Sequence, residues 1–128
     1  MLSGEEDQER KLEQRTIFVI GYQGKYMIRK RPEKGLLAGM WELPGQEQHM
    51  SLEEIRDWTS EWDLSGDIQL LGRAKHIFSH VEWHMLGYGI HLRGIPDQLQ
   101  AEGIFCDVQT LREQYSIPTA FAYYLQSL

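Results

Sequence analysis

The chain has 128 residues, which fits one domain with a single hydrophobic core. Its formal net charge of −6 excludes a protein that holds DNA mainly by bulk positive charge. The longest apolar runs, such as 17–20, are too short to span a membrane, and the polar start is unlike a secretory signal. The single cysteine, Cys106, excludes an internal disulfide and a cysteine-held cluster in this chain. We therefore expect an intracellular, cytoplasmic monomer that is not attached to a membrane.

Residues 1–15 are polar and rich in charge, so we expect a solvated tail or interdomain linker before a folded domain at 16–128. The continuous apolar run at 16–22 predicts a strand buried on both faces. The alternating segment at 25–31 should pair back on it as a hairpin. A loop is predicted at 32–40, followed by a short extended piece at 41–43.

The clearest helix is predicted at 51–62. Ser51 and Glu54 have the spacing of a capping box, which satisfies the free amide groups at a helix start. Apolar residues recur at helical spacing and should form its buried stripe. The members of this stripe are Leu52, Ile55, Trp58 or Thr59, and Trp62.

Strands are expected at 67–76 and 81–93, and a shorter extended segment at 103–108. A helical turn or two should follow at 108–115, and a last helix at 118–126 has Pro118 at its first turn. A few helices against a mixed sheet predict an α+β fold, arranged as an α/β/α sandwich.

The segment at 29–45 reads RKRPEKGLLAGMWELPG and resembles the Nudix family in its glycine-containing loop and its W-E-x-P-G segment before a helix. That resemblance implies a catalytic box, G-x5-E-x7-R-E-x2-E-E-x-G, whose glutamates would hold Mg²⁺ against a diphosphate. Aligned on Gly45, the box loses its Arg and Glu residues here. The replacing residues are Ser51, Thr59, Ser60, Asp63 and Leu64, while Gly66 fits the final glycine. We therefore expect a Nudix-like frame with a non-functional box and no metal.

The segment at 75–88 reads KHIFSHVEWHMLGY, and the later segment at 116–125 reads SIPTAFAYYL. Together with the 29–45 segment they resemble the C-terminal, MutT-like domain of the MutY family over nearly all of 16–128. MutY proteins are adenine DNA glycosylases that remove adenine mispaired with 8-oxoguanine in base-excision repair. The resemblance implies that this chain has no catalytic residue and that an N-terminal domain in cis, with a 4Fe–4S cluster, does the excision.

The resemblance also implies that Phe78, Ser79 and His80 read the 8-oxoguanine strand of duplex DNA. Guanine presents N7 as an acceptor, whereas 8-oxoguanine carries a hydrogen there, which the Ser79 hydroxyl can accept. His80 would meet a phosphate. Phe78 would either wedge beside a base step or serve as a core residue at a strand end, and the residues alone leave this open.

The densest basic cluster in the sequence contains Arg29, Lys30, Arg31 and Lys34. These side chains could contact DNA phosphates, or they could equally be a solvated hairpin edge, because charged edges prevent strand addition. Three histidines spaced four apart, at 76, 80 and 84, would converge on a helix, but their neighbours favour strands around a loop. Two other functions remain open: a free-standing Nudix-type hydrolase of nucleoside diphosphates, and a Nudix-fold protein-interaction module.

Overall fold

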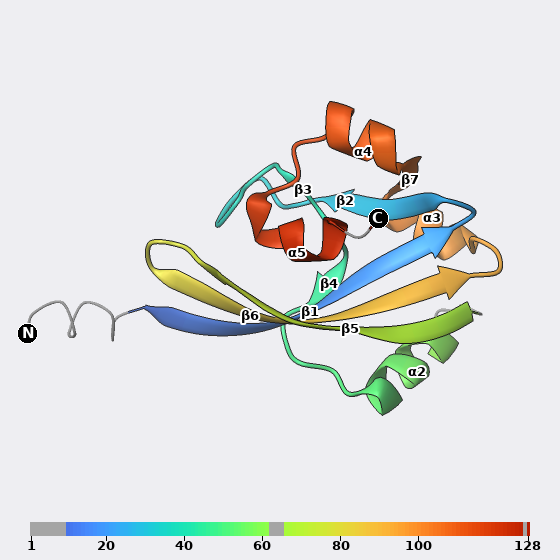
Figure 1. Ribbon diagram of the computed structural model, residues 1–128, viewed down its shortest axis with the longest axis horizontal. Coiled ribbons are helices and arrows are strands. Elements are labelled where there is room, and N and C mark those ends of the chain that lie inside the picture. The colour runs from blue at the N-terminus through green and yellow to red at the C-terminus, as the bar shows by residue number, and fades with distance from the viewer. Residues whose placement is uncertain (1–9, 62–65, 127) are drawn as a thin grey trace, which may run out of the picture.

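A computed structural model describes residues 10–61, 66–126 and 128 (Figure 1). The strands are β1 (Lys11–Tyr22), β2 (Lys25–Lys30), β3 (Trp41–Glu42), β4 (Gly45–Gln46), β5 (Gly66–Ile77), β6 (Val81–Leu92) and β7 (Ile104–Asp107). The helices are α2 (Leu52–Glu61), α3 (Asp97–Glu102), α4 (Val108–Gln114), the 3₁₀ turn η1 (Thr119–Phe121) and α5 (Ala122–Leu125). All predicted strands are present within one or two residues of their expected ends, except the start of β1.

The central sheet has the order β3-β2-β1-β6-β5, with β4 added beside β1 and β7 beside β2. β1 and β6 run parallel and the other pairs are antiparallel, so the sheet is mixed. Helices cover both faces in Figure 1, with α2 on one side and α4 and α5 on the other. This arrangement confirms the predicted α+β fold and its sandwich form.

Strand β1 supplies side chains to both halves of the core, as its continuous apolar run predicted. Ile17 and Val19 pack into a cluster with Phe121 and Tyr124 on the α5 side. Phe18 and Ile20 pack into a second cluster that includes Ile55 of α2. The sheet therefore separates two apolar layers, and the four buried apolar residues of β1, Ile17–Ile20, alternate between them.

β1 begins at Lys11, five residues before the predicted start of the folded domain. Its first residues pair in parallel with β6, from Lys11 opposite Val81 onward. Local polarity pointed to a tail, but a strand needs only backbone partners, and charged side chains on its outer positions can stay in water. The predicted tail thus contributes 11–15 to the sheet, while 1–9 lie outside the described residues.

The capping box of α2 is confirmed. The backbone amide of Glu54 donates to Ser51 Oγ over 3.1 Å, and the amide of Ser51 donates to Glu54 Oε1 over 3.1 Å. The predicted stripe is partly wrong, because Leu52 is 40% exposed and only Ile55 and Thr59 are fully buried. Leu52 is the first residue of the helix, and its side chain stays largely in solvent. The predicted Trp62 lies outside the described residues.

Two differences lie near the C-terminus. Helix α3 was not predicted, because its six residues bury only Leu99 and show no helical periodicity. The predicted last helix begins instead as the 3₁₀ turn η1, and its α-helical part covers only Ala122–Leu125. Both segments are too short for sequence spacing to define their type.

The first half of β1 and the β5–β6 hairpin extend together beyond the helices (Figure 1). We call this three-stranded extension, residues 10–16 and 72–86, the arm. Its end carries the 78–80 turn, which is the segment that the sequence singles out for DNA recognition. The fold therefore presents that turn at the far end of a projecting sheet.

Candidate nucleic-acid interface

The 78–80 turn joins β5 to β6 and is held by two backbone hydrogen bonds. The amide of Phe78 donates to the carbonyl of Val81 over 2.7 Å, which closes the turn. The amide of Lys11 donates to the carbonyl of His80 over 2.9 Å, which ties the turn to β1. The early start of β1 thus has a direct consequence, because it supplies the strand that holds the predicted recognition turn.

Phe78 packs inward from the turn. Its ring meets Trp83 edge to face, with centroids 5.1 Å apart, and meets His76 at 4.7 Å. It is half-buried against the cluster on the α5 side of the sheet. These contacts match the strand-end core role that the sequence left open for Phe78, and they anchor the turn.

Trp83 is the support beneath this anchor. Its side chain is 0% exposed, and its indole Nε1 donates to Glu13 Oε1 over 3.2 Å. The Arg15 guanidinium lies over the same ring, 4.4 Å from its centroid, in a cation–π contact. The sequence analysis did not assign Glu13 or Trp83 to the turn. The signal that could have indicated Trp83 is its place on the next strand, five residues after Phe78.

Ser79 and His80 have exposed side chains at the end of the arm. The Ser79 hydroxyl is both a donor and an acceptor, and the His80 ring offers at least one N–H donor. The structure therefore separates the three predicted residues by role: Phe78 holds the turn and the other two face solvent. Two exposed polar groups on a fixed turn can meet a base edge and a neighbouring phosphate.

Below the turn, the Glu82 carboxylate is surrounded by three basic side chains. Its carboxylate lies 2.6 Å from His84 Nε2, 3.4 Å from Arg10 Nη1 and 4.0 Å from Lys75 Nζ. The pKa of Glu82 lies below its usual range, mainly because of the hydrogen bond with His84. Burial opposes this effect, and the charge of Lys75 adds to it. An ionised Glu82 thus fixes basic side chains beside the turn.

The basic cluster at 29–34 divides into two pairs. Arg29 Nε donates to Glu42 Oε2 over 2.9 Å and Arg31 Nη1 donates to Glu42 Oε1 over 2.6 Å. Glu42 is only 7% exposed, so these two arginines neutralise a buried carboxylate. Lys30 and Lys34 are exposed, and Lys30 pairs with Glu33 at 3.2 Å. Only the lysines of this cluster present their charge mainly to solvent.

The region of the expected Nudix box has the predicted loop and helix, but its side chains differ from those of the box. The acids of α2 are all exposed: Glu53, Glu54, Asp57 and Glu61. Within the described ranges, no group of three or more His, Cys, Asp or Glu side chains is placed to hold a metal ion. His76 and His84 sit opposite Trp83 and Lys75 in neighbouring pairs of the hairpin, so they point to opposite faces of the sheet.

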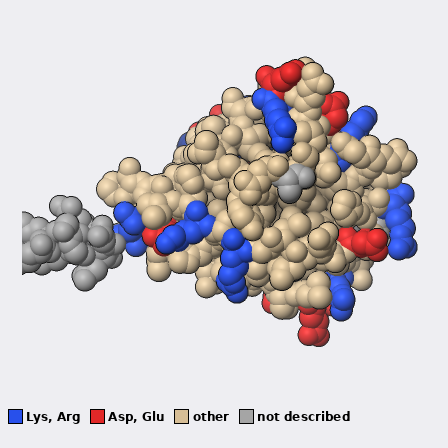
Figure 2. All heavy atoms as spheres, in the orientation of Figure 1, with Lys and Arg blue, Asp and Glu red and all other residues tan. Residues whose placement is uncertain are grey.

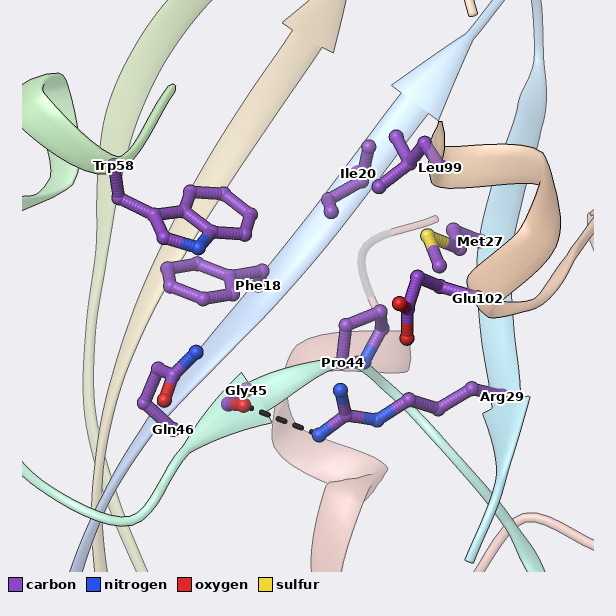
Figure 3. A pocket seen from close by; sticks show the side chains of 10 residues that line it. All are labelled: Phe18, Ile20, Met27, Arg29, Pro44, Gly45, Gln46, Trp58, Leu99 and Glu102. Carbon is purple, nitrogen blue, oxygen red and sulfur yellow. Dashed lines mark hydrogen bonds between the residues drawn. The ribbon is translucent and has the colours of Figure 1, made fainter. Parts of the chain in front are cut away.

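A small cavity lies between α2, β1 and α3 (Figure 3). Trp58 stacks on Phe18 within it, with ring centroids 4.7 Å apart and planes 11° from parallel. Arg29 reaches across to the carbonyl of Gly45 at 3.1 Å. The cavity has a volume of about 60 Å³. Sites for drug-sized ligands have about 300–1,000 Å³, so a nucleotide does not fit this cavity as it stands.

Residues 16–127 match the NUDIX domain family. The chain belongs to this family. Among curated proteins, the rat adenine DNA glycosylase is 36% identical over 76 residues, which are 53% of this chain and 14% of that protein. The fission yeast adenine DNA glycosylase is 43% identical over 68 residues, which are 44% of this chain and 15% of that protein. The matched part of the chain thus covers about a seventh of the length of these relatives.

Solved structures share the fold. The C-terminal domain of mouse MUTYH, solved in complex with human PCNA, matches with a TM-score of 0.62 and 21% identity over 90% of this chain and 88% of that one. A MutT Nudix hydrolase from Burkholderia pseudomallei matches with a TM-score of 0.65 and 20% identity, over 93% and 99%. Among the described residues, no helix is long and apolar enough to cross a membrane.

Proposed function

We propose that this chain is the 8-oxoguanine-recognition domain of an adenine DNA glycosylase that removes adenine mispaired with 8-oxoguanine. The observation that carries the proposal is the 78–80 turn, whose Ser79 and His80 side chains are exposed while Phe78 is docked on Trp83. The sequence similarity to adenine DNA glycosylases supports it. The exposed acids of α2 and the small cavity beside Trp58 favour this reading over a nucleotide hydrolase.

Recognition follows from the hydrogen-bonding pattern of the damaged base. 8-Oxoguanine turns the N7 acceptor of guanine into a donor and adds an acceptor oxygen at C8. The Ser79 hydroxyl accepts from N7–H, and a backbone amide of the turn or the same hydroxyl donates to the oxygen. A guanine at this position could accept from the Ser79 hydroxyl at N7, but it offers no N7–H donor and no C8 oxygen, so the second hydrogen bond of the pair would be lost. Such paired recognition discriminates by about 1–3 kcal/mol.

Excision itself belongs to a catalytic domain in cis. That domain would carry the 4Fe–4S cluster, flip adenine out of the duplex and hydrolyse its N-glycosidic bond, while the present chain checks the opposite strand. Tethering explains how a domain of net charge −6 takes part in DNA binding, because the catalytic domain holds it at high effective concentration at the site. We expect the isolated domain to be an intracellular monomer that binds DNA weakly.

The test joins this domain to its catalytic partner and measures excision from 8-oxoguanine:A and G:A duplexes. Ser79→Ala should lower the preference for 8-oxoguanine:A by about tenfold, because one paired recognition is lost. His80→Ala should slow excision from both duplexes. Ser60→Ala is the matched control, since Ser60 is exposed on α2 and remote from the arm. An unchanged preference in Ser79→Ala would contradict the proposed role of the turn.

A further inference from the structure

One face of the arm is an open sheet surface built from three strands. Paired residues on neighbouring strands point to the same side, so the registers define rows across it. The first row contains Leu12, Glu82 and Ile77, and the second contains Gln14, His84 and Lys75. The third row contains Thr16, Leu86 and Arg73. The third row is already covered at Thr16, which is 0% exposed and hydrogen-bonds to Gln48 and Met50 of the segment before α2. The next row, with Phe18, lies under Trp58 of α2, so the face is open at the first two rows and at Arg73.

This face is exposed and hollowed. Leu12 is 63% exposed and Ile77 is 48% exposed at its outer end. The Lys75 side chain is 57% exposed and that of His84 is 44% exposed. A shallow depression behind them is lined by Arg73, Lys75 and His84 together with two neighbours from β5 and β6.

The charge of the arm is opposite to that of the whole chain. Its residues include five Lys or Arg and two Glu, which gives +3 with histidines neutral, whereas the chain carries −6. Lys and Arg side chains gather over the arm in Figure 2. Both glutamates are engaged with arginines, Glu13 with Arg15 at 3.2 Å and Glu82 with Arg10 at 3.4 Å. On the open face itself, Arg73 and Lys75, with Arg10 at Glu82, outnumber the one carboxylate, and this excess of positive charge is complementary to a polyanion.

We propose that Arg73, Lys75 and His84 form a phosphate-binding surface that follows the backbone of the lesion-containing DNA strand away from the 78–80 turn. The inference rests on the proposed function, since it takes DNA as the partner. In this proposal the open face of the arm binds the DNA backbone, and the 78–80 turn at the end of the arm recognises the base.

Spacing supports this assignment. Arg73 and Lys75 lie two positions apart on β5, and residues two apart on a strand are about 7 Å apart on one face. DNA rises about 3.4 Å per nucleotide along its axis, and its phosphates are farther apart than this because each strand winds around the axis, so the two side chains can face phosphates of neighbouring nucleotides. Arg can bind a phosphate with two parallel hydrogen bonds, and Lys acts as a point charge. Glu82 holds Lys75 and His84 on the open face before DNA arrives.

The experiment titrates the chain with a duplex that holds one 8-oxoguanine:A pair and with the same duplex holding G:A, over a series of salt concentrations. Arg73→Ala with Lys75→Ala should weaken binding to both duplexes by about tenfold, and the slope of log affinity against log salt should fall by about one per lost cation. The preference for 8-oxoguanine should stay unchanged. Lys25→Ala with Arg56→Ala removes the same charge from exposed positions outside the arm, and should change affinity little.

Each outcome decides one of the two proposals. If the arm variant has the same affinity and salt slope as the control, the proposed phosphate-binding surface is wrong. If it changes the base preference without changing the salt slope, the arm reads bases and the assignment is again wrong. If Ser79→Ala leaves the preference intact while the arm variant loses its slope, the lesion-reading function fails and the phosphate surface stands. Arg73→Lys with Lys75→Arg should restore the slope, which separates charge from packing.

Discussion

The arm and the α2 region use aromatic side chains in opposite ways. In the arm, Trp83 is fully buried and carries Phe78, and so fixes a turn whose polar residues stay in solvent. At α2, Trp58 lies over Phe18 beside a cavity of about 60 Å³, and the nearby acids point into water without forming a metal site among the described residues. Trp83 supports a turn that exposes polar residues, whereas Trp58 fills space between α2 and the sheet. This contrast is why we place recognition in the arm and assign no chemistry to the helix.

Replacing Trp83 should produce the largest effect. Trp83→Ala should lower the free energy of unfolding by about 3–5 kcal/mol, because it leaves a cavity beneath Phe78 and removes one hydrogen-bond donor to Glu13. Trp58→Ala should cost less, since Trp58 is only half-buried. Denaturant unfolding of both variants measures the difference. Equal losses would mean that the two regions are equally supported, and the contrast between them would fail.

The clamp on Glu42 should come next in size. Glu42→Ala leaves Arg29 and Arg31 beside an empty position, which should lower the free energy of unfolding by about 3 kcal/mol. Glu33→Ala is the matched control, because Glu33 is exposed and pairs only with the exposed Lys30 among the described contacts. If both substitutions cost the same, the arginines are not held by the buried carboxylate, and they return as candidates for binding DNA phosphates.

The smallest effect concerns Glu82 and pH. The fold depresses the pKa of Glu82 below its ordinary value of 4.5, so ionised Glu82 stabilises the protein above that pH. The contribution is lost as the pH falls through the folded-state pKa. Glu82→Gln should therefore reduce stability slightly near neutral pH and should match the parent protein in acid.

Denaturant unfolding at a series of pH values measures this difference. Glu33→Gln serves as the control, and its stability should parallel that of the parent at every pH. A Glu82→Gln variant that stays less stable than the parent well into the acid range would show that the carboxylate acts by packing. In that case Glu82 would not be the group that orients Lys75 and His84 by charge.

Local patterns in the sequence predicted much of the framework. Apolar runs and the capping box at Ser51 and Glu54 marked most strands and α2, because these signals depend on near neighbours. The beginning of β1 was missed, because charged residues there gain order only from pairing with β6, far along the chain. Helix α3 was missed because it buries one residue, Leu99, and a single apolar position gives no helical periodicity.

The candidate site divides along the same line. The sequence by itself determined that 78–80 lies between two strands, that the Nudix box lacks its arginine and glutamates and that one cysteine cannot hold a cluster. Only the tertiary structure decided that Phe78 is an anchor, that Arg29 and Arg31 are engaged by Glu42, and that Arg73, Lys75 and His84 share one face. The reason is physical: composition follows the chain, but burial, ion pairing and a shared face arise between strands that meet only on folding.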